Sequence, residues 1–199
     1  MKIGGIIAYI GAEAFWKSLS KQEQRQIKLW YTENKTSFGY KSDPKIIDHG
    51  KIEYSSATKD GFFGGWANWA ISAKLYDFAE KMLLYAEENI SSALQYHFTC
   101  NSFISLYYKQ RNTRPDAIEK TKEYCLKDIN QYSRYAKILH EDGKVQCPAF
   151  KRLCIIYEKE ENYAAAIEIC KKAIKYELHD GTKADFSGRL ERLLRKEKS

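Results

Sequence analysis

The stretch that decides the fold is Cys147 to Tyr176, which reads CPAFKRLCIIYEKEENYAAAIEICKKAIKY. Pro148 suits the first turn of a helix, because the N–H that proline lacks would have no partner there. Apolar residues then recur at helical spacing as far as Tyr157. A charged break at 158–162 follows, and a second amphipathic run begins at Tyr163. The stretch therefore predicts two helices joined by a short turn.

The order of aromatic, hydrophobic and small residues in this hairpin resembles the tetratricopeptide repeat (TPR). The matching residues are Phe150, Leu153, Cys154, Tyr157, Ala166 and Ala173. The proline usual near the end of such a repeat is absent, and Leu178 stands in its place. Cys154 and Ala166 are small where the two helices approach most closely, since a large side chain would force them apart. The resemblance implies an α-solenoid built from helical hairpins.

Two further segments share the pattern. The segment 60–93 matches well, at Phe63, Trp66, Ala67, Tyr76, Ala79, Leu83 and Ala86, although Ala70 replaces the usual aromatic residue. The segment 98–131 matches less well: Ser105, Tyr108 and Ala117 fit, whereas Thr121 and Tyr124 depart from the pattern. Pro115 is expected to begin the second helix of that hairpin. A connector at 132–146, expected to be partly helical, separates it from the last repeat at 147–180.

The flanks are predicted to cap the array, because exposed ends of a solenoid need polar covers. Residues 1–59 form the N-terminal cap, in which Ser20 and Glu23 make a capping box that opens a helix to about Glu33. Residues 36–56 are expected to be loop, with a short strand at 51–55. Residues 181–199 are expected to form a basic capping helix. The predicted fold is thus all-α: a TPR-like α-solenoid of about three irregular hairpins, residues 60–180, between capping helices.

Composition and charge narrow the class of protein. The net charge is +7, which favours an anionic partner, but the charges are interspersed, so a merely solvated basic surface is equally compatible. The five cysteines are an odd number without C-x-x-C spacing, which indicates free thiols and a reducing compartment. The apolar start at 3–12 is short and broken by glycine, so it imitates a signal peptide poorly. We therefore expect a cytoplasmic protein that does not span a membrane.

Catalytic and metal motifs are missing from the sequence, so an enzyme is not expected. There is no G-x-S-x-G elbow, Walker loop or H-E-x-x-H. The glycine-rich stretch 61–65 lacks the lysine of a phosphate loop, and close packing before a repeat helix explains it better. His97 and Cys100 share a helical face and could hold half a zinc site, but no second pair completes it. We predict no cofactor and no metal.

The TPR resemblance implies that ligands bind the concave surface formed by the first helix of each hairpin. Carried onto this sequence, the candidate binding residues are Asn68, Lys109, Gln110, Arg111, Lys151, Arg152 and Glu158. The preferred interpretation is a non-catalytic adaptor that binds a protein or peptide segment in this groove. The alternative is an anionic ligand, either RNA, DNA or a nucleotide. Stacking and charge at 107–111 and cations on the tail helix (Arg189, Arg192, Arg195 and Lys196) would serve that ligand.

Overall fold

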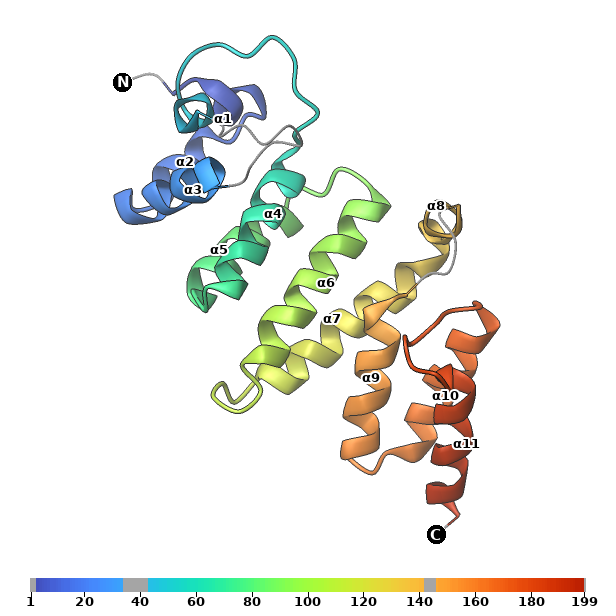
Figure 1. Cartoon of the computed structure of the whole chain (residues 1–199). Helices are drawn as coiled ribbons and strands as arrows, with labels where there is room; N and C mark the ends of the chain where they lie inside the picture. Colours follow the sequence, from blue (N-terminus) through green and yellow to red (C-terminus); the bar gives the residue numbers. More distant parts are fainter. Residues whose placement is uncertain (1–2, 34–42, 142–145, 199) are drawn as a thin grey trace. The chain divides into compact units, whose positions relative to one another are not determined.

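The computed structural model of the chain describes residues 3–33, 43–141 and 146–198. Every regular element in these ranges is a helix, which confirms the all-α class (Figure 1). The strand expected at 51–55 is wrong, because these residues follow an irregular path. A short strand needs a neighbour to pair its backbone groups, and none of the described ranges contains one. Two compact units divide the chain, Met1–Ser91 and Ser92–Ser199.

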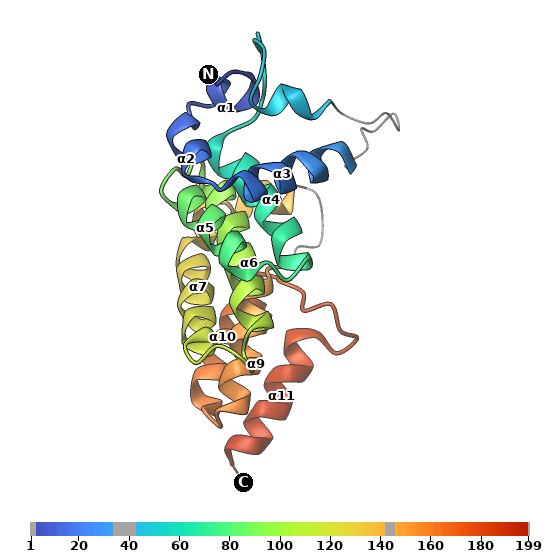
Figure 2. The same cartoon turned by 90° about the vertical axis from the view of Figure 1, so that its left-hand side faces the viewer.

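The first unit contains five α-helices and a short 3-10 helix in its described part (Figure 2). Their bounds are α1 (Gly5–Tyr9), α2 (Glu13–Ser18), α3 (Lys21–Glu33), η1 (Pro44–Ile47), α4 (Lys59–Ser72) and α5 (Tyr76–Glu87). The predicted loop at 36–56 begins within 34–42, outside the described residues. The hairpin α4–α5 is the predicted repeat that starts at residue 60, and Ala67, Ala79 and Ala86 are fully buried in it.

Two glycines fasten the start of the chain to η1. The backbone N–H of Gly4 donates to the carbonyl of Asp48 at 2.8 Å, and that of Gly5 donates to the carbonyl of Gly50 at 2.9 Å. Gly5 has φ +61°, and a Cβ there would stand 2.1 Å from the carbonyl oxygen of Ile46. Glycine is required at this position because any side chain would collide with the backbone of η1.

Side-chain caps set two helix starts in the first unit. Ser20 and Glu23 form the predicted capping box: the Ser20 N–H donates to the Glu23 carboxylate at 2.6 Å, and the Glu23 N–H donates to the Ser20 hydroxyl at 3.2 Å. Thr58 accepts from the N–H of Gly61 at 3.2 Å, so α4 begins at Lys59. The glycine-rich stretch 61–65 therefore lies inside a helix rather than before one, and it is not a phosphate-binding loop.

The second unit contains the other two predicted repeats as hairpins α6–α7 and α9–α10. The bounds of its elements are α6 (Ala93–Lys109), α7 (Ala117–Gln131), η2 (Tyr132–Arg134), α8 (Ala136–His140), α9 (Pro148–Lys159), α10 (Tyr163–Lys175) and α11 (Asp185–Glu197). Pro148 is the first residue of α9, as predicted, whereas α7 begins two residues after Pro115. The connector is partly helical, as η2 and α8 show.

Small residues bring α9 and α10 together as the sequence predicts. Cys154 and Ala166 have no exposed surface, and the Cys154 thiol lies 3.6 Å from the Ala166 carbonyl oxygen. The Cys154 and Cys170 sulfurs are 3.4 Å apart, and both cysteines are free. In the other hairpin the rings of Phe103 and Tyr124 stack with centroids 4.0 Å apart. Tyr124 is thus a core residue, although it departs from the repeat pattern.

The helix α11 packs along α10 and ends the described part of the chain (Figure 1). Leu193 and Phe186 are buried on its inner face. Arg189 was expected to be one of the tail-helix cations that could serve an anionic ligand, but only 8% of its surface is exposed. It lies inward because its guanidinium pairs with buried Asp180, with 2.8 Å between Nη2 and Oδ2.

Candidate functional site

The second unit has a pocket of about 190 Å³ beside α9. Its lining residues are Gln146, Cys147, Pro148, Lys151, Arg152, Ile155, His179 and Asp180. The helix α9 supplies Lys151, Arg152 and Ile155 at helical spacing, and the turn after α10 supplies the last two residues. The pocket therefore joins one face of a predicted repeat helix to the segment that leads into α11.

The cations in and beside this pocket contact neutral groups, namely a backbone carbonyl and an aromatic ring. The Lys151 ammonium donates to the carbonyl oxygen of Asp180 at 2.6 Å. The Arg152 guanidinium carbon lies 3.5 Å from the centroid of the Tyr108 ring, and that of Arg111 lies 4.6 Å from the same centroid. A cation over an aromatic face is attracted by the negative potential of the ring, but its charge is not cancelled.

Carboxylates do not neutralise these cations within the described residues. No Asp or Glu in residues 3–33, 43–141 and 146–198 lies within ion-pair distance of Arg111, Lys151 or Arg152. Lys109, at the end of α6, is exposed and also lacks a carboxylate partner in that part of the chain. Four cations of the second unit, contributed by α6, the residues after it and α9, thus keep their positive charge available.

Three of the predicted site residues have other positions or partners. Gln110 is buried, and its side-chain amide donates to the Leu106 carbonyl at 3.1 Å, so it supports the end of α6. Glu158 accepts from Arg192 and Lys196 of α11, so it is not available to a ligand. Asn68 is exposed on α4, in the first unit, and donates to the Gly64 carbonyl at 3.1 Å.

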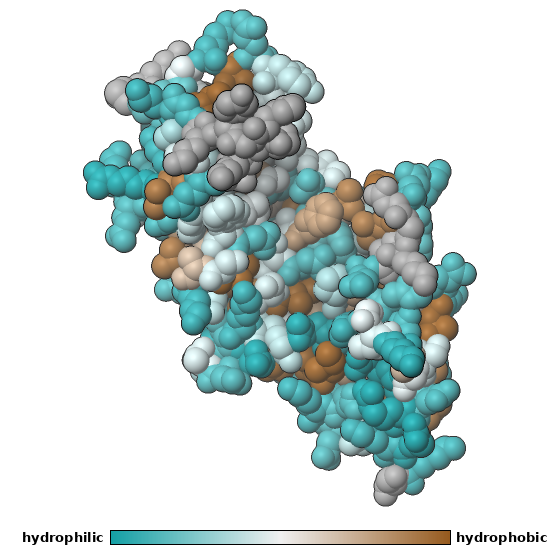
Figure 3. Space-filling view, viewed as in Figure 1, coloured by the Kyte–Doolittle hydropathy of each residue, from teal (hydrophilic) through white to brown (hydrophobic). Residues whose placement is uncertain are grey.

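The tail helix differs from the expected basic helix because three of its cations, Arg189, Arg192 and Lys196, are paired with carboxylates. Two nitrogens of Arg192 donate to the Glu158 carboxylate, at 3.1 and 2.9 Å. The Lys196 ammonium lies 2.9 Å from the same carboxylate. The hydrogen bonds from Arg192 and Lys196, together with their charges, lower the pKa of Glu158 to about 2, although partial burial opposes the shift. In Figure 3 the surface over α11 is largely hydrophilic.

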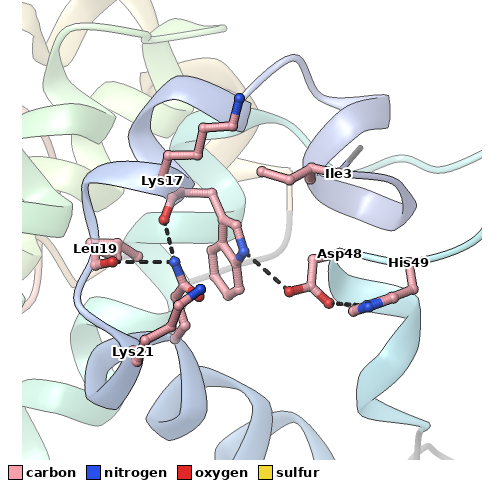
Figure 4. A pocket seen from close by; sticks show the side chains of 8 residues that line it. Ile3, Lys17, Leu19, Lys21, Asp48 and His49 are labelled. Carbon is pink, nitrogen blue, oxygen red and sulfur yellow. Dashed lines mark hydrogen bonds and ion pairs between the residues drawn. The ribbon is translucent and has the colours of Figure 1, made fainter. Parts of the chain in front are cut away.

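A second pocket, of about 270 Å³, lies in the first unit between α2, α3 and η1 (Figure 4). Its floor is Asp48, which accepts from the Trp16 indole N–H at 3.2 Å and pairs with the Lys28 ammonium at 2.7 Å. Burial alone would raise the pKa of Asp48, but Lys28 and His49 outweigh it and hold the pKa below its ordinary value. This carboxylate is fully used in fastening η1 to α2 and α3, so the pocket is the weaker candidate.

A buried polar cluster in the second unit was not expected from the sequence. The His97 ring contacts the Asp128 carboxylate, with Nδ1 2.9 Å from Oδ1, and Cys147 donates to the other oxygen at 3.4 Å. Among the described residues, the metal-type ligand atoms near His97 belong to Asp128 and Cys147, and not to Cys100 as the sequence suggested. The available signal was Asp128 itself, a charged residue on the apolar face formed by Tyr124, Cys125 and Ile129.

Comparisons with known proteins found similarity to an uncharacterized protein. No protein-family model matches the chain, and no solved structure matches it significantly. The chain is similar to an uncharacterized protein of Aquifex aeolicus (strain VF5), with 29% identity over 203 residues. The aligned region covers 97% of this chain and 93% of that protein, so the similarity includes both units. None of the helices that the structure describes is long and apolar enough to cross a membrane.

Proposed function

We propose that this chain is a non-catalytic, TPR-like binding protein that holds an acidic segment of a partner protein against α9. The observation that carries the proposal is Arg152, whose guanidinium is fixed on Tyr108 without a carboxylate among the described residues to neutralise it. Lys151 and Ile155 line the adjacent pocket. A held cation beside an apolar wall suits an extended peptide that carries carboxylates.

The fixed geometry of these cations, in addition to their charge, favours binding of an acidic ligand. Lys151 and Arg152 are half-buried, and each is already oriented by a contact within the protein. These side chains therefore lose less conformational freedom when they bind a ligand carboxylate than mobile surface lysines would lose. A binding role in the cytoplasm is consistent with five cysteines that are all free and buried.

Carboxylates fit this surface better than nucleic-acid bases do. Base recognition on a single strand relies on aromatic faces that are open for stacking. The ring of Tyr108 already carries Arg152 at 3.5 Å and Arg111 at 4.6 Å, while Tyr107 and Tyr124 are buried. The described part of this surface thus offers cations rather than stacking platforms.

A direct binding measurement tests the proposal. Fluorescence anisotropy of a labelled Asp/Glu-rich peptide should report binding that weakens as salt is raised, because screening acts on the cations. Arg152→Glu should weaken it by tenfold or more, about 1.4 kcal/mol. The matched control is Lys175→Glu, which makes the same charge change at an exposed position of α10 outside the pocket.

The outcomes separate the two classes of partner. Selective loss of peptide binding in Arg152→Glu, with Lys175→Glu close to wild type, supports the proposal. Equal weakening by both variants would show a diffuse charge effect and overturn the site. If a labelled oligothymidine binds and the acidic peptide does not, the partner is nucleic acid. If neither probe binds, the α9 surface is not an anion-binding site.

A further inference from the structure

The buried cluster around Asp128 collects metal-type ligands from three separate segments of the second unit. His97 comes from α6, Asp128 from α7, and Cys147 immediately precedes α9. The exposed fraction of the side chain is 4% for His97 and 0% for Asp128, and Cys147 is also buried. The nitrogen, oxygen and sulfur atoms that they offer all lie within 4.8 Å of one another.

Distances within the cluster approach those around a tetrahedral metal ion. Bonds of about 2.0–2.3 Å to nitrogen, oxygen and sulfur place neighbouring ligand atoms roughly 3.3–3.7 Å apart. Asp128 Oδ2 lies 3.1 Å from His97 Nδ1 and 3.4 Å from the Cys147 sulfur. Asp128 Oδ2 is therefore close to the spacing expected around one ion with both of the other ligand atoms.

Surrounding side chains orient two of the three ligands. The Tyr135 hydroxyl donates to Asp128 Oδ1 at 2.7 Å, and Oδ2 is the carboxylate oxygen that contacts both His97 and Cys147. The Asn101 amide lies 2.9 Å from His97 Nε2, on the far side of the ring from Asp128. Metal-binding histidines are commonly held in this way, by a polar group on the nitrogen that does not bind the metal.

The amide of Asn101 suggests a second arrangement of this cluster. Its Oδ1 is buried and has no hydrogen-bond partner, while Nδ2 faces the ring. Because the two ends of an amide are nearly alike in shape, a half-turn would bring Oδ1 to His97 Nε2. Nε2 would then carry the hydrogen and donate it, and Nδ1 would present a lone pair toward Asp128. That neutral tautomer is repulsive toward Asp128 unless a positive charge, either a proton on Nδ1 or a metal ion, lies between Nδ1 and the carboxylate.

We propose that His97, Asp128 and Cys147 form a binding site for one divalent ion of the zinc type, with Asn101 and Tyr135 as orienting residues. Mixed nitrogen, oxygen and thiolate ligands suit Zn²⁺ and Co²⁺ better than Mg²⁺ or Ca²⁺. A dication between one carboxylate and one thiolate also leaves the buried site with no net charge, which limits the cost of burial.

Binding of the ion changes the protonation of two ligands. The Cys147 thiol gives up its proton to solvent, and the His97 hydrogen moves from Nδ1 to Nε2. The ion must therefore displace a proton, so its affinity should increase with pH. Cys147 also lines the pocket beside α9, so this pocket borders one of the three ligands.

Cobalt titration of the whole chain, first stripped with a chelator, tests this site. One equivalent of Co²⁺ should produce a thiolate-to-cobalt charge-transfer absorption, which Zn²⁺ should remove. Cys147→Ser should abolish the absorption, whereas Cys100→Ser should retain it. Cys100 is the matched control because it is equally buried and lies one helical turn after His97.

Native mass spectrometry of the unmutated protein with added Zn²⁺ makes the result independent of any variant that fails to fold. One bound ion per chain and a raised melting temperature are expected. A wild-type protein that binds no ion, or an absorption that survives in folded Cys147→Ser, would overturn the site. The cluster would then be a hydrogen-bonded core network centred on Asp128.

Discussion

The α9 face and the tail helix α11 both carry cations, but among the described residues carboxylates pair with three cations of α11 and with neither Lys151 nor Arg152 of α9. Arg189, Arg192 and Lys196 are paired with Asp180 or Glu158. Arg152 instead lies on the Tyr108 ring, and Lys151 donates to a backbone carbonyl. Positive residues can therefore be neutralised on one surface and remain available to a ligand on another. Pairing, rather than the net charge of the chain, indicates where an anion could bind.

The largest effect that this comparison predicts is at Arg189. Arg189→Met removes the cation from Asp180, which is 3% exposed and would be left as an uncompensated buried charge. We expect the free energy of unfolding to fall by about 3 kcal/mol, as for other broken buried pairs. Urea denaturation followed by circular dichroism measures it. Arg195→Met, at an exposed position of the same helix, should change it by less than about 0.5 kcal/mol; equal losses would contradict the inward position of Arg189.

An intermediate effect on the free energy of unfolding is expected when the pH is lowered and Glu158 is protonated. Its pKa is about 2 in the folded protein and 4.5 ordinarily, so folding favours the ionised form. The contribution to stability is therefore complete above pH 4.5 and is lost as the pH falls toward 2. Because Arg192 and Lys196 are half-exposed, we expect only about 1 kcal/mol.

Comparison with Glu158→Gln isolates this contribution from other carboxylates that titrate in the same range. The free energy of unfolding of the wild type should exceed that of the variant at pH 6, and the difference should disappear near pH 2. A difference that stays constant over this range would mean that the ion pairs do not fasten α11 to α9.

The smallest effect on folding should come from the α9 cation itself. Arg152→Ala removes a cation from the Tyr108 ring, and such contacts contribute about 0.5–1 kcal/mol. A melting curve should therefore shift by only a few degrees, while binding of an acidic peptide weakens strongly. A loss of stability as large as that of Arg189→Met would show that Arg152 is a structural residue and would remove the contrast between the two surfaces.

The hairpins were predictable because small and aromatic residues recur at fixed spacing. Cys154 and Ala166 are buried at the α9–α10 contact as expected, and the capping box at Ser20 forms as predicted. These features are local, since helical periodicity and a cap depend on residues a few positions apart. The same spacing also placed Lys151 and Arg152 beside one another on α9, where they line the pocket.

The partners of the charged residues were not predictable, because they come from distant parts of the chain. Glu158 was expected to face a ligand, yet α11 returns to it from residues 192 and 196. His97 was compared with its neighbour Cys100, whereas its contact is Asp128 on the next helix. A helical face is visible in the sequence, but the residue opposite that face depends on how the hairpins pack.

The close fit of Gly4 and Gly5 against η1 has a consequence for synthesis on the ribosome. Translation proceeds from the N-terminus, so α1 emerges before the carbonyls of Asp48 and Gly50 that its backbone will bind. Until then Ile6 and Ile7, which are buried in the finished unit, remain open to water and to chaperones. A pause in translation before residue 50 would therefore leave Ile6 and Ile7 uncovered.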